Sequence, residues 1–585
     1  MPDIPRQRLL SLQRFFAISK PFFTGENRSK GRVLVGVLLG LCVTVGGVQV
    51  LMSYAARDFI SALTERDHDR WIRSFWKYLG TFALSIPIGV FYRYWQERLS
   101  LAWRQWMTQH LIKRYFFNRA YYRLRSSETV DNPDQRIAED VRLFTTGTLN
   151  FFLILINSFV TLFGFLGVLW LISGKLVGVL LVYALVGTTI SILVGRRLVG
   201  LHFHQYQKEA DFRYGLIRVR ENAESIAFFR GEKNEHRDQI QRFAAVLKNS
   251  LEIINWNRNL GFFINGYNYL ALLLPVMVVG PLYMSGLVEF GVVTQAEGAF
   301  AQVLIALSVI ITQFENLSAF TAGVQRLGAL WDFLDEYDVE EKREAAQDQV
   351  EETAEGSRLA IERLTVQTPG GEKTLARNLS FELEPGQSLF ITGDSGGGKS
   401  SLLRTIAGLW HAGSGSIQRP TLKRMMFLPQ KPYMIQGSLR AQLMYPFHES
   451  DANDKVIATV LQEVNLEEIL TRVDGDLSKV VDWTNILSLG EQQRVSFARL
   501  FLKKPEVAFL DEATSALDES NERTLYHKLR DSGISFVSVG HRSTLTEFHD
   551  RKLQLNRDGT YELTDLVKED KPILRIKPIL SPLEF

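Results

Sequence analysis

Three stretches in the second half of the chain combine glycine, lysine, carboxylate and histidine residues at spacings that suit phosphate chemistry. The first is Gly393-Asp394-Ser395-Gly396-Gly397-Gly398-Lys399-Ser400, which follows the apolar run Ser388–Thr392 and precedes apolar residues at helical spacing. Glycines let backbone N–H groups approach a phosphate closely, and the N-terminus of the following helix adds positive potential. In this strand–loop–helix setting Lys399 would reach the β- and γ-phosphates, and the Ser400 hydroxyl would bind Mg²⁺. The stretch, extended to Ser401, therefore predicts an ATP site; a glycine loop that is merely flexible is the alternative.

Two later stretches argue against that alternative. Residues 507–510 predict a buried strand that ends in Asp511-Glu512. This is the place for a carboxylate that binds a Mg²⁺-bound water, followed by a general base. Residues 534–540 predict a second strand, which ends at His541. A lone histidine is more often structural than functional, but its position at a strand end after Glu512 favours a role in the site.

The composition divides the chain into two parts of different character. Its 585 residues are 46% hydrophobic and 22% charged, with a formal net charge of +3, but the long uncharged runs all lie before residue 330. The single cysteine, Cys42, excludes an intrachain disulfide and a multi-cysteine metal site. The nearly neutral charge argues against a nucleic-acid partner, which usually needs a basic surface. A membrane part followed by a soluble α/β part is expected.

Six uncharged runs predict six membrane-spanning helices. About 20 apolar residues in a helix cross the hydrocarbon core, where backbone polar groups must be satisfied internally. The second run is short, and the sixth contains Gln302 and Ser308. A large soluble helical core is the alternative, and the number of long runs argues against it. The runs are Val33–Leu51, Tyr78–Tyr92, Leu143–Gly174, Leu176–Gly195, Asn259–Val288 and Gly298–Phe314.

The distribution of lysine and arginine predicts that both termini are cytoplasmic. These residues are frequent before residue 33 and in segments 93–142 and 196–258, whereas the connections after the third and fifth runs carry only Lys175 or none. Segment 1–32 is expected to be a cytoplasmic or interfacial helix, with Leu9, Leu12 and Phe16 on one face. The prediction is a multi-pass protein of the lipid bilayer, in a bacterial inner membrane, with an organelle membrane as the alternative.

An acidic stretch separates the two parts. Ten aspartates and glutamates lie between Asp335 and Glu355 and predict a solvated linker. The expected division is an N-terminal segment 1–32, a six-helix transmembrane domain 33–334, a linker 335–357, a nucleotide-binding domain 358–565 and a tail 566–585.

These motifs together resemble the ATP-binding cassette of ABC transporters, and the whole chain resembles a half-transporter. The resemblance implies an α-helical six-span transmembrane domain of the ABC exporter type, fused to an α/β P-loop cassette that hydrolyses ATP to drive transport. It identifies residues 393–400 as the Walker A loop and Leu487-Ser488-Leu489-Gly490-Glu491 as the signature. The remaining assignments are Gln430 as the Q-loop glutamine and a Mg²⁺ ligand, Asp511 as the Walker B aspartate, Glu512 as the catalytic base, Ser515–Asp518 as the D-loop and His541 as the switch histidine.

The chain departs from the family pattern at two places. The signature carries Leu489 where glycine is usual and Glu491 where glutamine is commonest, although Ser488 and Gly490 are kept. The aromatic side chain that usually stacks on adenine would fall near Thr368 and is missing. A working but slower site is therefore expected. Either another residue stacks on the adenine, or selectivity between ATP and GTP is weak, and GTP is then expected to support hydrolysis almost as well as ATP.

More narrowly, the chain is similar to the subfamily D half-transporters of peroxisomes and lysosomes and to their bacterial relatives, whose membrane domain is related to the SbmA/BacA-type peptide-uptake proteins. This similarity rests on Asn132–Ile137, Glu224–Gly231, Pro429–Met434 and Asp482-Trp483. It implies an organic solute: cobalamin, an acyl-CoA or fatty acyl compound, or a peptide. Within the runs, Asn150, Asn157, Asn265, Tyr267, Asn268 and Gln302 either line a polar cavity or join helices by hydrogen bonds.

The resemblance also implies that one chain cannot complete an ATP site. The Walker A loop of one cassette faces the signature of another, so Ser488 and Gly490 of one protomer would complete the γ-phosphate shell of the other. The expected partner is therefore a second copy of the chain, and the expected mechanism is alternating access. A non-transporting membrane ATPase that gates a partner is the alternative; the intact Lys399, Glu512 and His541 argue against it.

Overall fold

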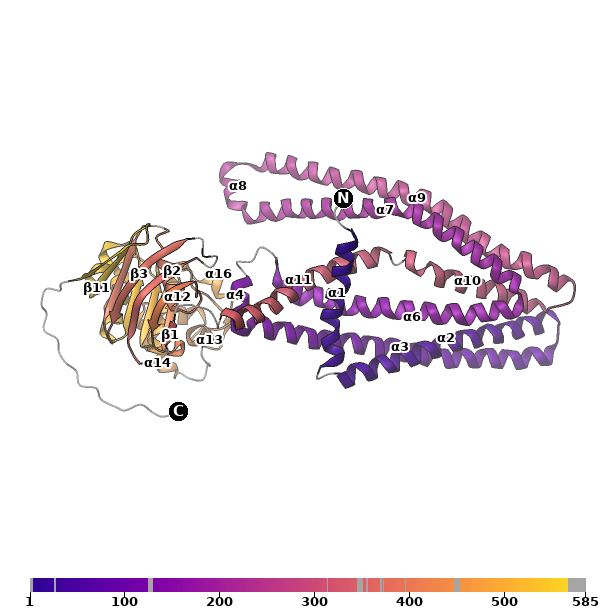
Figure 1. Cartoon of the computed structure of the whole chain (residues 1–585), viewed down its shortest axis with the longest axis horizontal. Coiled ribbons are helices and arrows are strands. Elements are labelled where there is room, and N and C mark those ends of the chain that lie inside the picture. Colours follow the sequence, from indigo (N-terminus) through magenta and orange to yellow (C-terminus); the bar gives the residue numbers. More distant parts are fainter. Residues whose placement is uncertain are drawn as a thin grey trace. The chain divides into compact units, whose positions relative to one another are not determined.

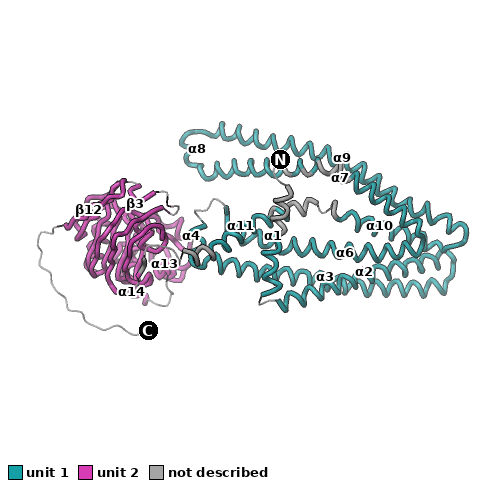
Figure 2. The backbone as a smooth tube through the Cα atoms, in the orientation of Figure 1, with its two compact units in different colours: residues 1–339 teal, residues 340–585 magenta. Residues whose placement is uncertain are grey.

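The computed structural model describes residues 4–25, 28–124, 130–312, 314–344, 351–353, 356–368, 371, 373–394, 396–446 and 453–566. The chain divides between Val339 and Glu340 into two compact units (Figures 1 and 2). This division falls inside the acidic stretch. The predicted tail, from residue 567 onward, lies outside the described residues.

The first unit is helical throughout its described part, since an apolar run inside a bilayer can satisfy its backbone groups within a helix. α2 (Arg28–Thr64) lies along α3 (His68–Phe116), and α7 (Gly174–Glu221) lies along α9 (Glu232–Met284), with α8 (Ala223–Phe229) at the turn between them (Figure 1). The other helices are α1 (Ile4–Thr24), α4 (Ala120–Leu124), α5 (Pro133–Gln135), α6 (Val141–Ile172), α10 (Phe290–Thr312) and α11 (Phe314–Glu344), with a 3₁₀ turn at Phe117–Arg119.

Most described residues of the six predicted runs lie on these long helices, but the helices differ in how well they suit a membrane. Among the described residues, four helices are long and apolar enough to cross one: Arg28–Thr64, Pro133–Ile172, Glu232–Met284 and Phe290–Val309. Gly174–Ile190, on α7, is a shorter apolar helix. α3, which contains the run Tyr78–Tyr92, is not among these four, and the run alone would cover about 22 Å of a hydrocarbon core of roughly 30 Å. The count of six spans therefore stays a prediction.

Several helices of this unit continue well beyond any membrane. α9 has 53 residues, and at 1.5 Å per residue such a helix is about 80 Å long. Its partner α7 has 48 residues. The apolar run of α9 occupies only its second half, and the preceding half is charged. The long connections between the apolar runs are therefore built largely as extensions of these helices.

A charge cluster holds the turn that leads into α6. A π-helical turn runs from Arg136 to Asp140, and both residues are at most 5% exposed. The Arg136 guanidinium donates to the backbone carbonyls of Asp131 and Arg326 and pairs with the Asp131 carboxylate. Arg326, on α11, pairs with Asp140 at 2.6 Å. The segment Asn132–Ile137 therefore ties the start of α6 to α11, and loss of one partner would leave a buried charge unpaired.

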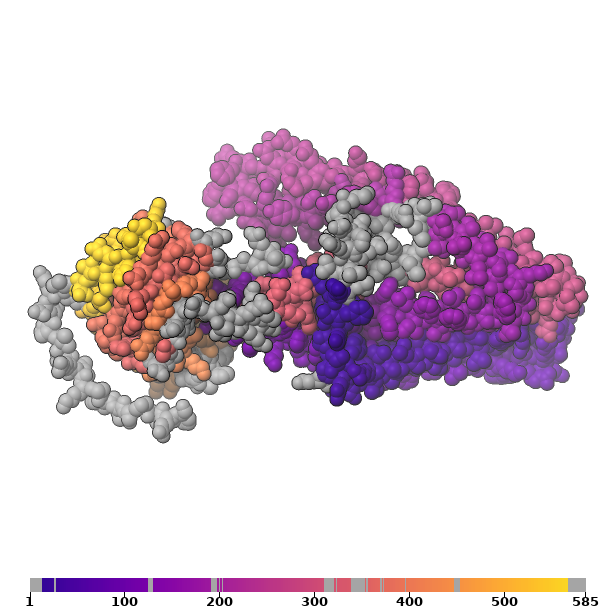
Figure 3. All heavy atoms as spheres, viewed as in Figure 1, coloured from indigo at the N-terminus to yellow at the C-terminus, as the bar shows by residue number. Residues whose placement is uncertain are grey.

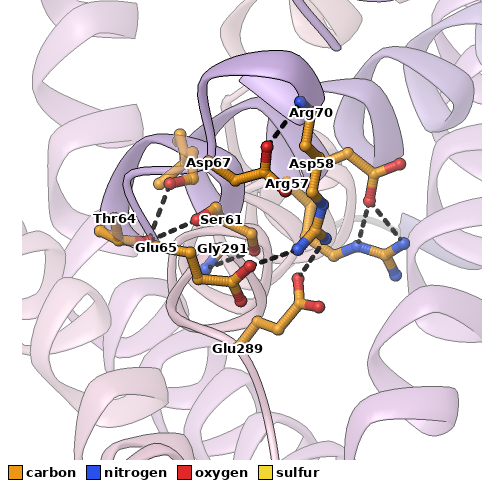
Figure 4. Close-up of polar contacts among 10 residues, drawn as sticks. Arg57, Asp58, Ser61, Thr64, Glu65, Asp67, Arg70, Glu289 and Gly291 are labelled. Atoms are coloured by element: carbon orange, nitrogen blue, oxygen red, sulfur yellow. Dashed lines mark hydrogen bonds and ion pairs between the residues drawn. The ribbon is translucent and has the colours of Figure 1, made fainter. Parts of the chain in front are cut away.

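A second polar network joins the α2–α3 connection to the start of α10 (Figure 4). Arg70 donates to Glu65 at 2.5 Å and to Glu289 at 2.8 Å. The hydrogen bonds that Glu289 accepts from Arg70 and from Ser61 hold its pKa below the usual value. The backbone N–H of Gly291 donates to the Ser61 hydroxyl at 3.2 Å. This network fixes one end of the α2–α3 pair to α10.

The acidic stretch between the units is more ordered than a solvated linker. α11 continues to Glu344, and Glu351–Thr353 form strand β1, which pairs in parallel with β5 (Gly413–Gln418). Glutamate and lysine favour helix, and β1 is held by the ladder of a neighbouring strand. Residues 345–350 lie outside the described part.

The second unit is an α/β domain built on two main sheets. The larger has the strand order β12-β11-β4-β10-β9-β6, in which every neighbouring pair except β11–β12 is parallel. The smaller has the order β1-β5-β2-β3, and β7 pairs with β8. The strands, after β1, are β2 (Leu359–Gln367), β3 (Thr374–Leu383), β4 (Ser388–Gly393), β5, β6 (Met425–Leu428), β7 (Gly437–Ser438), β8 (Val480–Val481), β9 (Val507–Asp511), β10 (Ser535–Val539), β11 (Arg551–Leu555) and β12 (Tyr561–Asp565).

Helices surround these sheets, and two buried apolar clusters fill the space between them. The strands at the centre of the larger sheet are almost wholly buried, as expected for parallel strands that are covered on both faces. The helices are α12 (Lys399–Ile406), α13 (Leu439–Met444), α14 (Asp454–Glu463), α15 (Glu468–Arg472), α16 (Trp483–Ile486), α17 (Leu489–Lys503) and α18 (Glu519–Asp531), with 3₁₀ turns at Leu422–Arg424 and Ser543–Phe548. A space-filling view shows this unit from one side (Figure 3).

Candidate active site

Three adjacent parallel strands bring the predicted site residues to one edge of the larger sheet. β4 leads into the glycine-rich loop, β9 ends in Asp511, and β10 lies between them and leads to His541. In the strand register, Val539 is opposite both Ile391 and Asp511. In open parallel sheets ligands bind beyond the carboxyl ends of the strands, and all of these side chains lie at that edge.

The glycine-rich loop needs glycine for conformation and for space. Gly393, Gly396 and Gly398 have φ of 138°, 79° and 91°. A Cβ at Gly393 would lie 2.1 Å from the carbonyl oxygen of Leu555, and one at Gly398 would lie 3.0 Å from the Leu375 side chain. The loop therefore passes directly against β11 and β3 and ends at the N-terminus of α12. Ser395 lies outside the described residues.

Lys399 and Ser400 open α12 and face different partners. The Lys399 ammonium donates to the carbonyls of Gly393 at 2.8 Å and Asp394 at 3.0 Å. Burial lowers the pKa of Lys399, and the nearby carboxylates partly offset this effect. The Ser400 hydroxyl donates to the Asp511 carboxylate at 3.0 Å. Burial raises the pKa of Asp511 despite this hydrogen bond.

Glu512 has an unusual backbone and two side-chain neighbours. Its φ is 49°, a left-handed conformation that costs a non-glycine residue about 1–3 kcal/mol. Its N–H donates to the Val539 carbonyl at 3.0 Å, which holds it against β10. Its carboxylate accepts a hydrogen bond from the Gln430 amide at 2.8 Å and lies 3.4 Å from Nε2 of His541. The structure thus brings together Gln430, Glu512 and His541, which lie far apart in the sequence.

The predicted signature residues begin a helix elsewhere in the same unit. Ser488 caps α17 in a capping box with Glu491, and Glu491 also pairs with Arg472 at 2.6 Å. Burial raises the pKa of Glu491, but hydrogen bonds from Arg472 and Ser488 outweigh it and hold that pKa below its usual value. Among the described residues, the side-chain hydrogen bonds of Ser488 and Glu491 stay within this group and do not reach the glycine-rich loop. Leu489 is 45% exposed.

Two further positions bear on the expectations. Thr368 is near the place where an aromatic side chain usually stacks on adenine, and its hydroxyl accepts a hydrogen bond from the N–H of Lys373 at 3.2 Å. Weak selectivity between ATP and GTP stays a prediction. Gln493 and Arg542 were not predicted from the sequence, although both contact segments that carry site residues. Their only signals were their positions, just after the signature and next to His541.

Comparisons with known proteins match both units. The family description "ABC transporter transmembrane region 2" matches residues 18–284, and "ABC transporter" matches residues 376–515. An uncharacterised ABC transporter ATP-binding protein of Synechocystis is 43% identical, over 91% of this chain and 82% of the relative. The chain belongs to the ABC transporter family.

Other relatives of this ABC transporter lie in subfamily D. ABC transporter D family member 2, chloroplastic, of Arabidopsis thaliana is 39% identical over 95% of this chain and 87% of the relative. The human lysosomal cobalamin transporter ABCD4 is 33% identical over 96% and 97%. A solved bacterial Atm1-family ABC exporter with ATP bound has a TM-score of 0.69 at 15% identity and covers 91% of this chain and 95% of that one, which shows the exporter-type fold.

The family and the geometry agree on the general chemistry. The cassette of this transporter binds ATP, and its hydrolysis is coupled to transport by a multi-pass membrane protein. The resemblance to ABC half-transporters of subfamily D and the exporter-type fold are confirmed by these comparisons.

Proposed function

We propose that the protein is a homodimeric half-transporter that uses ATP to move an amphipathic or bulky organic solute by alternating access. One observation supports the homodimer. Each chain has one glycine-rich loop and one signature, and the side-chain hydrogen bonds of Ser488 and Glu491 do not reach the described part of the loop in the same chain. A second copy, related by a two-fold axis, would supply Ser488 and Gly490 to that loop. The proposed location is a bacterial inner membrane, with an organelle membrane as the alternative.

The nucleotide site follows from the contacts at the sheet edge. Backbone N–H groups of the loop and the Lys399 ammonium would bind the phosphates. The oxygens of Ser400 and Asp511, 3.0 Å apart, fit the hard oxygen ligands that Mg²⁺ prefers, and Gln430 is the third proposed ligand. Mg²⁺ would neutralise charge on the phosphate oxygens. Glu512 would orient and deprotonate the attacking water, and His541 would contact the γ-phosphate.

A cavity in the first unit supports an amphipathic solute. It has a volume of about 730 Å³ and lies among α3, α6 and α11. Its polar wall includes Gln96, which donates to Asn150 at 2.7 Å, and Asn157; its apolar wall includes Phe144, Phe151 and Phe320. Such mixed walls suit a solute with both polar and apolar parts. Cobalamin, a fatty acyl compound and a peptide remain the three candidates, and the name of ABCD4 favours testing cobalamin first.

Reconstitution tests this function. The purified transporter in sealed proteoliposomes should hydrolyse ATP faster with its solute, and the labelled solute should cross the bilayer only with ATP. Cobalamins, acyl-CoAs and peptides form the test panel. The matched variant Lys399→Ala should abolish both signals. ATP hydrolysis without ATP-dependent flux of any panel member would favour a nucleotide-gated membrane ATPase instead.

A further inference from the structure

Side-chain contacts and short stretches of chain form a closed ring around Glu512 in the second unit. Gln430 and His541 both contact its carboxylate, at 2.8 Å and 3.4 Å. The turn Ser515–Asp518 begins three residues after Glu512 in the chain. Two further side chains close the ring: Gln493 joins Gln430 to this turn, and Arg542 joins the turn to His541.

Gln493 uses both ends of its amide to join three segments. It is 1% exposed. Its Nε2 donates to the backbone carbonyl of Gln430 at 3.3 Å and to the Ser515 hydroxyl at 3.1 Å, while its Oε1 accepts from the N–H of Ala516 at 3.0 Å. The neighbouring Gln492 is also buried, but it bonds only to carbonyls of its own segment, at Thr484 and Leu487. Gln493 therefore connects functional segments rather than merely satisfying a buried amide.

Arg542 performs the same connection on the other side. Its guanidinium donates to the carbonyls of Ser515 at 3.4 Å and Leu517 at 3.2 Å. It also pairs at 3.2 Å with Glu522, which is 1% exposed and accepts a hydrogen bond from the Thr514 hydroxyl at 2.7 Å. A buried carboxylate needs such partners, so the position of the guanidinium is strongly constrained. Because Arg542 follows His541 directly, this constraint also places the histidine.

We propose that Gln493 and Arg542 are positioning residues for ATP hydrolysis: together with the Ser515–Asp518 turn they hold Gln430 and His541 against the Glu512 carboxylate. This inference rests on the proposed role of Glu512 as the base. A base acts only when its carboxylate lies within hydrogen-bonding reach of the attacking water. Glu512 has a left-handed backbone, and the two described side chains that contact its carboxylate are those of Gln430 and His541. The ring supplies those neighbours from both sides.

The test measures kcat and KM for ATP in the full-length transporter in lipid nanodiscs. Gln493→Met keeps the length of the side chain and removes its polar atoms. It should lower kcat about 10-fold or more, since a displacement of about 1 Å can cost 100-fold, while KM for ATP changes less than about two-fold. Arg542→Gln should behave alike, and Arg542→Lys, which keeps the charge beside Glu522, should recover part of the rate.

Two control variants separate positioning from folding. Gln442→Ala removes a fully buried glutamine that holds the backbone of Ile435, and Arg551→Gln removes an arginine that pairs with Asp565 and donates to the Glu382 carbonyl. Neither contacts the ring. Gln442→Ala should lower the melting temperature, and Arg551→Gln should lower it less because Asp565 is exposed. In both, kcat per folded molecule should stay unchanged.

The decisive arm repeats Gln493→Met in a Glu512→Gln background, by single-turnover hydrolysis. If Gln493 acts through Glu512, removing the carboxylate first should leave a further loss of less than about two-fold. An additional loss as large as in wild type would overturn the inference and leave the base assignment intact. A Glu512→Gln variant with nearly wild-type rate would overturn the base assignment, and this inference with it.

Discussion

Glu491 occupies a position where glutamine is commonest in the family, and its contacts explain how a glutamate is accommodated there. Its carboxylate accepts from the backbone N–H of Ser488 at 2.8 Å and from the Ser488 hydroxyl at 2.9 Å, and it pairs with Arg472. A glutamine could accept the hydrogen bonds from Ser488 but would lose the ion pair. The substitution relative to the family thus adds a charge contact beneath the signature without changing the cap.

Glu491→Gln should therefore destabilise the protein slightly, by about 0.5–1 kcal/mol at pH 7. Because the pKa of Glu491 is held below its usual value in the folded protein, this contribution is present above the ordinary glutamate pKa of about 4.3 and is lost as the pH falls through the lower folded value. Thermal unfolding of the full chain, followed by intrinsic fluorescence from pH 8 down to pH 4, measures it. In the Arg472→Gln background the effect should vanish; an equal loss there would contradict the ion-pair explanation.

The sequence predicted those residues of the candidate site that stand at the ends of apolar runs. The glycine-rich loop, Asp511-Glu512 and His541 each end an apolar run, and the order of three adjacent strands then brings them together. Gln493 and Arg542 could not be predicted in this way. Their hydrogen bonds reach Gln430 and Ser515, 63 and 27 residues away, and such contacts leave no spacing pattern.

At the scale of elements, the contact between α2 and α10 depends on one glycine. A Cβ at Gly291 would lie 2.1 Å from the carbonyl oxygen of Arg57 and 2.4 Å from the Ser61 hydroxyl, so the two helices meet there without room for a methyl group. The Arg70 ion pairs with Glu65 and Glu289 lie beside this crossing (Figure 4). If the transporter opens at this end, the crossing and the ion pairs have to separate together.

Gly291→Ala should push the start of α10 away from α2 and cost about 1–3 kcal/mol through overpacking. The matched control is Gly298→Ala on the same helix, where a Cβ would meet nothing within 4 Å. Spin labels at Arg66 and Leu287, in a Cys42→Ser background, report the separation of the two connections. The distance between the labels should lengthen in Gly291→Ala and not in Gly298→Ala. An unchanged distance would show that the helices accommodate the added methyl group by a different movement.

Elements were predicted least well where composition and backbone structure disagree. The run Tyr78–Tyr92 is too short to be a span by composition, yet α3 continues through it as one helix of 49 residues. The acidic stretch predicts solvated chain, yet α11 persists to Glu344 and Glu351–Thr353 join a sheet. In both cases backbone hydrogen bonds to neighbouring residues or strands decide the outcome, and hydropathy does not record them.

For the whole molecule, the central question is whether two copies share their ATP sites. Lys399 lies in one half of the proposed composite site and Gly490 in the other; a Cβ at Gly490 would already lie 3.0 Å from the Ala516 carbonyl oxygen. Homodimers of Lys399→Ala would have both sites broken, and so would homodimers of Gly490→Asp. In a dimer of one Lys399→Ala chain and one Gly490→Asp chain, however, both substitutions lie in the same site. The other site combines an intact loop with an intact signature.

Co-expression of the two variants with different affinity tags tests this arrangement. Complexes that carry both tags should hydrolyse ATP at about half the wild-type rate, since one of the two sites in a two-fold dimer is intact. Each variant alone should be inactive, and mixing the two after separate purification should give no activity unless subunits exchange. Failure to recover complexes with both tags would contradict the homodimer. Recovery of inactive mixed complexes would instead mean that neither site hydrolyses ATP unless both sites are intact. The same complexes would then retain bound ATP at one site.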